Sequence, residues 1–351
     1  MRRIALSFAL AVATLIAGGS AESAPDEPRI HHQLTVNFDP AKHFIEVHDT
    51  ISFPDGMKAL PRRKDGGLVF RLHAGLEVSA VEGSDFEVQP LPQRDDEKKA
   101  MPPRRSFALV PKAGKPDAQA EAKIRYAGTI HHSVTQVSEE YARSFSQTPG
   151  TIEEKGVFLG GSSWWVPRMG DELVTFKMLA VPPEGWTVVT QGVRETVSMA
   201  GAQAWRCDHP MDEIYLIANT FTTYRRSSGS VEAQVYLRSK DDNLAAKYLE
   251  VTAQYVEMYR KLIGPYPYEK FALIENFWET GYGMPSFTLL GPRVIRFPFI
   301  LHSSYPHEIL HNWWGNSVYV DWGTGNWCEG LTAYLADHLV REGQGRGHEY
   351  R

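Results

Sequence analysis

Two histidines and a glutamate lie close together in the segment His307-Glu308-Ile309-Leu310-His311. If the segment is helical, both histidines lie on one face, because residues four apart are neighbours on a helix surface. Two such imidazoles can bind one zinc ion, and Glu308 can act as general base for a water molecule there. The competing interpretation is a chance match in a chain that holds 13 histidines. A third ligand would favour the zinc site.

A candidate third ligand follows in the segment Asn326-Trp327-Cys328-Glu329-Gly330. The pattern predicts a helix that begins here with Asn326 as a cap and ends at Gly343. Glu329 would complete a His, His, Glu set that leaves one zinc position open, which is typical of catalytic zinc sites. The alternative is an ordinary acid in the first turn of a helix.

These motifs together resemble the gluzincin aminopeptidase family, which includes aminopeptidase N and leukotriene hydrolase. The resemblance rests on His307-Glu308-x-x-His311 with Asn312-Trp313-Trp314-Gly315-Asn316, and on Trp327-Cys328-Glu329-Gly330. It extends to Gly264-Pro265-Tyr266-Pro267-Tyr268-Glu269-Lys270, similar to the family's turn before the substrate strand, and to residues 208–224, similar to the end of its N-terminal β domain.

The resemblance implies one Zn²⁺ per chain, held by His307, His311 and Glu329, with Glu308 activating the water. It also implies a peptide or protein substrate. Seventeen residues, 312–328, separate His311 from Glu329, one fewer than is usual in the family. A shorter loop around Gly323-Thr324-Gly325 would absorb this difference.

The family's exopeptidase motif matches Tyr282-Gly283-Met284-Pro285-Ser286 only in part. The resemblance implies that Gly281, Tyr282, Gly283, Met284 and Pro285 bind substrate along an edge strand. The motif's glutamate, which pairs with the substrate's amino terminus, is absent. Glu275 and Glu279 lie nearby in the sequence as possible substitutes, although both are also readily explained as ordinary surface or supporting acids.

The family's transition-state-stabilising tyrosine and helical C-terminal domain would follow the Glu ligand, but the sequence ends at Arg351. We therefore expect a C-terminally truncated member of the family. The alternative is a reduced fold in which a tyrosine upstream stabilises the transition state.

The motifs favour an exported zinc metallopeptidase that is aminopeptidase-like. The alternative is a non-catalytic zinc-containing module that binds peptides or acts as a scaffold, or an inactive fragment. Glu308 argues against this alternative, because a purely structural zinc ion needs no general base. Epoxide hydrolysis, known in one branch of the family, has no dedicated feature in this sequence.

The elements around these motifs predict an α+β fold. Apolar residues alternate with polar ones from residue 31 to about 225, as in Leu34, Val36 and Phe38, which indicates antiparallel strands. We predict an N-terminal antiparallel β-sandwich-like domain at 22–228. A thermolysin-like α/β zinc metallopeptidase domain, incomplete at its C-terminus, is predicted at 229–351.

Local patterns refine this division. Helical spacing begins at Asp241-Asp242 and predicts a helix of about twenty residues that ends before Gly264, with a short strand following at 271–277. Ser303 or Ser304 is expected to cap the helix that carries His307. Residues 85–120 and 135–155 are rich in polar residues or proline and are predicted as surface loops. His131 and His132 would point to opposite faces of a strand, so they are not expected to form a chelating pair.

Composition excludes several classes of protein. The chain has 351 residues, 42% hydrophobic and 23% charged, as in globular proteins, and its net charge of -5 offers no positive field for nucleic acid. Residues 1–21 resemble a signal peptide, with an uncleaved membrane anchor as the alternative. Export to the periplasm or the medium is expected, with no membrane span after signal removal. Cys207 and Cys328 are expected to be separate buried thiols.

Overall fold

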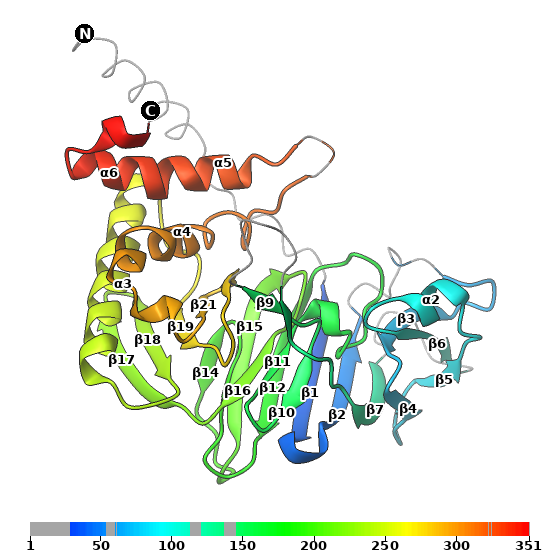
Figure 1. Ribbon diagram of the computed structural model, residues 1–351. Helices are drawn as coiled ribbons and strands as arrows, with labels where there is room; N and C mark the ends of the chain where they lie inside the picture. The colour runs from blue at the N-terminus through cyan, green and yellow to red at the C-terminus, as the bar shows by residue number, and fades with distance from the viewer. Residues whose placement is uncertain are drawn as a thin grey trace.

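The computed structural model describes residues 29–53, 60, 62–112, 121–136, 145–321, 323 and 325–350. The predicted signal peptide at 1–21 lies outside the described residues. The N-terminal part is built almost entirely of strands, and a smaller sheet with helices follows it, so the predicted α+β class is confirmed (Figure 1). Within the described residues no helix is long and apolar enough to cross a membrane.

A seven-stranded sheet forms the largest part of the molecule, in the order β14-β15-β12-β1-β2-β7-β4. Its strands are β1 (Ile30–Asp39), β2 (Phe44–Ser52), β4 (Leu76–Ala80), β7 (Glu121–Thr129), β12 (Val174–Val181), β14 (Val193–Glu195) and β15 (Gln203–Met211). Leu34, Val36 and Phe38 all point into the core, which confirms the predicted alternation. The antiparallel prediction is wrong at one pair: β1 and β12 run parallel, because a long excursion rather than a hairpin joins them.

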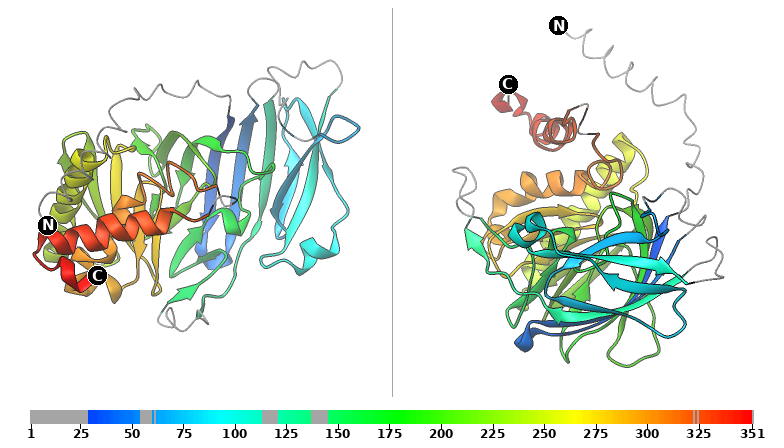
Figure 2. Two further views of the ribbon diagram at one scale, coloured as in Figure 1. Left: turned by 90° about the horizontal axis from the view of Figure 1, so that it is seen from above. Right: turned by 90° about the vertical axis from the view of Figure 1, so that its right-hand side faces the viewer.

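A four-stranded sheet and a three-stranded sheet accompany the seven-stranded sheet. The four-stranded sheet has the order β10-β11-β16-β13, with bounds β10 (Thr151–Glu153), β11 (Gly156–Leu159), β13 (Thr187–Val189) and β16 (Leu216–Asn219). The three-stranded sheet, order β3-β6-β5, lies at the end of the molecule far from the C-terminal helices, as Figures 1 and 2 show. Its elements are β3 (Leu68–His73), β5 (Phe86–Pro90), α2 (Asp95–Lys99) and β6 (Arg104–Pro111).

The prediction of a surface loop over 85–120 is therefore wrong for the described part, 85–112. Phe86, Phe107 and Leu109 are buried in the three-stranded sheet. Glu97 of α2 is also buried, and Ser106 donates a hydrogen bond to its carboxylate. Three large apolar side chains offset the cost of ordering this polar stretch. Residues 113–120 lie outside the described part of the chain.

The predicted loop at 135–155 is partly structured as well. The strands β8 (Thr135–Gln136) and β9 (Ser146–Gln147) pair with each other, and residues 137–144 between them lie outside the described residues. Thr151 and Ile152 of β10 are fully buried, so the end of this stretch belongs to the core.

A five-stranded sheet follows, in the order β17-β18-β19-β21-β20. Its strands are β17 (Thr222–Ser228), β18 (Val231–Leu237), β19 (Lys270–Glu275), β20 (Gly281–Met284) and β21 (Phe287–Leu290). β20 lies at the edge of the sheet, as expected for the segment at 281–285, and β19 is the predicted short strand. β17, which lies before residue 229 in the sequence, is already part of this sheet.

Helix α3 (Asp242–Leu262) packs against the five-stranded sheet and has the predicted extent. Asp241 caps it, because its side chain accepts a hydrogen bond from the Leu244 amide at 2.9 Å. Tyr248, Val251 and Tyr255, spaced three and four residues apart, form its buried face.

Two helical segments carry the candidate ligands. The first is α4 (Ser304–Leu310), and the second runs without interruption through α5 (Cys328–Thr332), the π-helical η8 (Ala333–His338) and α6 (Leu339–Gly343). The second segment lies across α4, as Figures 1 and 2 show. The predicted caps are wrong: Ser303 donates to the Phe299 carbonyl, and α5 begins after Trp327 without a side-chain cap.

Short helical turns complete the described chain. They are η1 (Pro40–Lys42), η5 (Gly161–Ser163), η6 (Val294–Arg296), η7 (Pro298–His302) and η9 (Gly347–Tyr350). Cys207 and Cys328 are both buried and free, which confirms the prediction of two separate thiols.

Candidate metal centre

Helix α4 presents His307 and His311 on one face. Its opposite side is anchored by buried Tyr305 and Ile309, and the Tyr305 hydroxyl shares a 2.6 Å hydrogen bond with Thr252 of α3. The two imidazole rings are 4.8 Å apart between centroids, at 78° to each other. The buried face thus fixes how the two imidazoles point into the cleft.

Glu329 of α5 completes the group. One carboxylate oxygen lies 3.2 Å from His307 Nε2, and the other lies 3.4 Å from His311 Nε2. The three ligand atoms lie within 4.8 Å of one another, and this is the one group of three such donors in the described chain. Two imidazole nitrogens and a carboxylate oxygen suit zinc, so the residues fit the implied metal.

Each histidine has a further contact through its other ring nitrogen. Asp337 of η8 lies 3.9 Å from His307 Nδ1, and the Cys328 thiol lies 3.6 Å from His311 Nδ1. Burial lowers the pKa of His307, but the nearby carboxylates of Asp337, Glu308 and Glu329 raise it above its ordinary value. Burial, followed by the charge of His307, lowers the pKa of His311.

Sequence reasoning missed Asp337. It stands eight residues after Glu329, and residues at i and i+8 share a helix face, so this spacing would have identified it. Carboxylates in this position fix the ring orientation of a metal-binding histidine.

Glu308 lies in the same cleft, on the side of the edge strand β20. Burial raises the pKa of its carboxyl to about 7, which suits a group that takes up and returns a proton near neutral pH. A side chain at Gly283 would collide with the end of the Glu308 carboxylate, so this carboxylate would have to move to make room for it.

A buried polar network connects α4 to the turn after β20. Asn312 accepts a 2.7 Å hydrogen bond from the Ser286 amide and donates to the Glu308 and Ile309 carbonyls. Lys270 of β19 donates to the Ser286 hydroxyl at 2.8 Å, and both side chains are buried. Burial lowers the pKa of Lys270 to about 7. The sequence motifs did not identify this network, which depends on tertiary contacts.

The cleft that contains these groups has a volume of ≈ 870 Å³. Gly281, Tyr282, Gly283 and Met284 of β20 line one wall, as predicted for substrate-binding residues, whereas Pro285 is not among the lining residues. A side pocket of ≈ 480 Å³ shares Tyr215, Tyr282 and Met284 with the cleft. The cleft is therefore large enough for several residues of a peptide.

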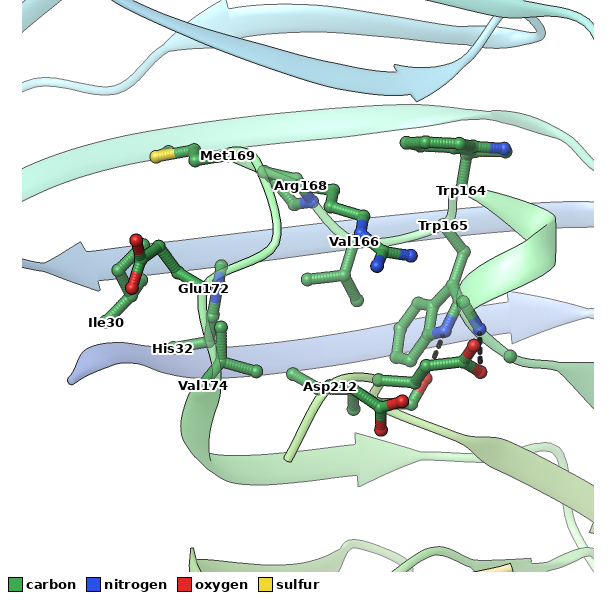
Figure 3. Close-up of a pocket in the computed structure, with 15 residues that line it drawn as sticks. Ile30, His32, Trp164, Trp165, Val166, Arg168, Met169, Glu172, Val174 and Asp212 are labelled. Carbon is green, nitrogen blue, oxygen red and sulfur yellow. Dashed lines mark hydrogen bonds between the residues drawn. The ribbon is translucent and has the colours of Figure 1, made fainter. Parts of the chain in front are cut away.

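The N-terminal part supplies the opposite wall, including Arg168, Asp212 and Tyr215. Figure 3 shows Arg168 and Asp212 in a smaller adjoining cavity of ≈ 40 Å³. Burial and the neighbouring Glu213 raise the pKa of Asp212. Tyr319, after α4, lines the cleft too, and burial raises its pKa, so its hydroxyl remains a hydrogen-bond donor.

Glu275 and Glu279 do not line the cleft. Glu275 is buried and accepts hydrogen bonds from the Arg238 amide at 2.8 Å and from Arg296 at 2.7 Å. Glu279 accepts from the Arg293 amide at 3.0 Å. Both glutamates therefore fill supporting roles. His131 and His132 point to different partners, Thr151 and His73, as expected for a non-chelating pair.

Neither a protein-family model nor a curated protein matches this chain. Solved structures do match it. The M1 zinc metallopeptidase from Deinococcus radiodurans is 16% identical over 91% of this chain and 71% of its own, with a TM-score of 0.65. A mutant of that enzyme bound to a Tyr-Ser-Ala substrate has a TM-score of 0.63 at 15% identity, over 91% of this chain and 72% of its own.

Native leukotriene A4 hydrolase from Saccharomyces cerevisiae is 14% identical over 96% of this chain, with a TM-score of 0.63. This chain covers 53% of that protein. At these identities the likeness establishes the fold, and the predicted β-domain and thermolysin-like arrangement is confirmed at that level.

Proposed function

We propose that this protein is a zinc metallopeptidase whose ion is held by His307, His311 and Glu329. The observation that carries the proposal is the convergence of these three groups beside Glu308 in an open cleft. The open fourth position, together with an acid placed to act as base, favours catalysis over a structural zinc site. The fold shared with M1 zinc metallopeptidases supports the same conclusion.

Each residue of the site would have its own role in peptide hydrolysis. A zinc ion in this site would polarise the scissile carbonyl and lower the pKa of the attacking water. Glu308 accepts the proton of that water and returns it to the departing amine. Asp337 orients His307, and the network of Asn312 and Ser286 holds β20 against α4.

The peptide would bind along β20. This strand has one hydrogen-bonded neighbour, β21, so its outer edge can pair with an extended chain. We propose aminopeptidase-like cleavage, although the segment 282–286 lacks the glutamate with which the resembled family pairs the substrate's amino terminus. We also propose that residues 1–21 direct export.

Digestion of a defined peptide mixture, followed by mass spectrometry, tests this function. The zinc-loaded protein should release products, a chelator should stop the release, and added zinc should restore it. Single residues removed from the amino terminus would indicate an aminopeptidase, and internal cuts an endopeptidase. Absence of any cleavage by zinc-loaded protein would instead favour a non-catalytic zinc-containing module.

A further inference from the structure

A further cavity, of ≈ 270 Å³, lies where β3 meets the loop before β12. Arg62, Arg63, Arg71 and Arg168 line this cavity, which we call the arginine pocket. Among the described residues that line it there is no acid, and the remaining ones are apolar or glycine. The whole chain has a net charge of -5, so the positive charge here is local.

The backbone forces two of these arginines together. Arg71 and Arg168 are paired across an antiparallel bridge, with hydrogen bonds of 3.0 and 3.1 Å in the two directions. Side chains directly opposite in such a bridge start only about 5 Å apart, and like charges there are destabilising. The bridge thus brings two cationic side chains to the wall of one cavity.

Arg71 lacks the partner that such a group needs. Its Nε is buried without a hydrogen-bond acceptor, and its guanidinium forms no ion pair within the described residues. Arg63 and Arg168 approach Asp65 at 3.0 Å and Asp171 at 3.9 Å, and both acids are substantially exposed. A buried donor left unpaired costs free energy, so an acceptor is missing from the pocket.

We propose that the arginine pocket binds an oxyanion, a carboxylate or a phosphate. The planar guanidinium fork matches both groups and can donate two parallel hydrogen bonds. Arg168 also lines the metal cleft, and Figure 3 shows it in the cavity that joins this cleft from the N-terminal side. Two sources can supply the anion: an acidic residue of a peptide that extends from the cleft, or a free anion.

Phosphate titration of the full-length protein tests binding without reference to activity. Calorimetry or thermal shift at constant ionic strength would compare wild type with Arg71→Met, which keeps the aliphatic stem and removes the charge. We expect Arg71→Met to weaken phosphate binding about tenfold or more. Arg226→Met, on exposed β17, is the matched control and should bind as wild type does.

The stability of the anion-free protein gives a second readout. Arg71→Met removes an unpaired buried donor, so this variant should be at least as stable as wild type without phosphate. General stabilisation by phosphate acts on all variants equally and cancels in the comparison. Should Arg71→Met fail to fold, Arg63→Met makes the same test.

Matched peptides distinguish the two sources of the anion, and this arm alone rests on the proposed peptidase function. Peptides carrying a single Glu at successive positions would be compared with their Gln counterparts. A lower KM for one Glu peptide, lost in Arg71→Met, indicates an anion from the substrate; phosphate binding without such a preference indicates a free anion. Identical responses of wild type, Arg71→Met and Arg63→Met to phosphate and to both peptides would overturn the proposal.

Discussion

At the scale of single residues, Gly283 of β20 lies directly against the end of the Glu308 carboxylate. Gly283→Ala would place a methyl group there and displace the carboxylate from its position beside the histidines. We expect kcat/KM to fall about a hundredfold, since a misplacement of about 1 Å can cost that much. Steady-state kinetics with zinc content measured on the same sample would check this.

Gly281→Ala is the matched comparison. A side chain at Gly281 finds its nearest neighbours at 4.0 Å, so this variant should lose much less activity than Gly283→Ala. Equal losses in the two variants, or a Gly283→Ala protein that has lost its zinc, would show that Glu308 is not crowded by the strand.

The pH dependence of stability tests the environment of Lys270. Burial lowers its pKa from 10.5 to about 7 in the folded protein. Between these values the unfolded chain binds a proton that the folded protein has released, so the free energy of unfolding should rise with pH from 7 to 10.5. Below pH 7 both states are protonated and the full cost of the buried charge remains.

Lys270→Met removes this titration, so its unfolding free energy should rise less steeply over the same range. Urea unfolding of both proteins at pH 7, 8.5 and 10 measures the difference in slope, whatever stability the variant loses with the Ser286 hydrogen bonds. Parallel pH profiles would mean that Lys270 is charged throughout.

At the scale of elements, the metal centre depends on how the second helical segment lies across α4. Trp314, just after α4, donates a 2.8 Å hydrogen bond to Thr332 of α5, and this contact brings Glu329 towards the two histidines. Asp337 reaches His307 from the same helical segment, two turns further on. One helical segment therefore supplies both a ligand and the group that orients another ligand.

Asp337→Ala should weaken zinc binding by about ten- to a hundredfold, as is usual for groups that orient metal ligands. Competition with a fluorescent zinc chelator would measure the affinity. Glu342→Gln, an exposed acid further along the same segment, controls for the loss of negative charge. An Asp337→Ala protein with the affinity of Glu342→Gln would indicate that His307 is oriented by its packing alone.

Much of the element pattern is predictable from local sequence. The helix at Asp242–Leu262 follows from apolar periodicity and turn residues, whereas the edge strand at Gly281–Met284 is expected from the family resemblance. The strands within 85–112 escaped prediction because the stretch as a whole is rich in charged residues and proline. Glu97 is buried with Ser106 and Arg94 as its partners. The charged and polar residues of this stretch predict a surface loop, because the tertiary contacts that bury some of them cannot be seen in the sequence.

In the candidate site, too, some residues are predictable from local sequence and others depend on tertiary contacts. The spacing of His307 and His311 on one helix is a local property, so the sequence alone places them together. Lys270, Ser286 and Asn312 come from three elements, and nothing in their separate surroundings indicates that they form hydrogen bonds with one another. The arginine pocket likewise depends on a bridge between residues 71 and 168, which no local pattern predicts.

At the scale of the whole molecule, the cleft lies between two structural layers. The strand-rich N-terminal part contributes Arg168 and Tyr215 to one wall, and β20 with α4 contributes the other. Contacts across this boundary include Trp278, which donates a hydrogen bond to the Ser146 carbonyl at 3.0 Å. In the proposed function, substrate recognition would involve both parts of the chain, whereas the proposed zinc ligands and the proposed general base belong to the second.

The measurement that tests the central claim most directly compares wild type with Glu308→Gln for zinc content and peptide turnover on the same samples. Both proteins should hold one zinc ion per chain, because the ligands His307, His311 and Glu329 are unchanged. Turnover of the variant should fall by about a hundred- to ten-thousandfold, since an amide cannot accept the proton of the attacking water. Near wild-type turnover by zinc-loaded Glu308→Gln would contradict the account.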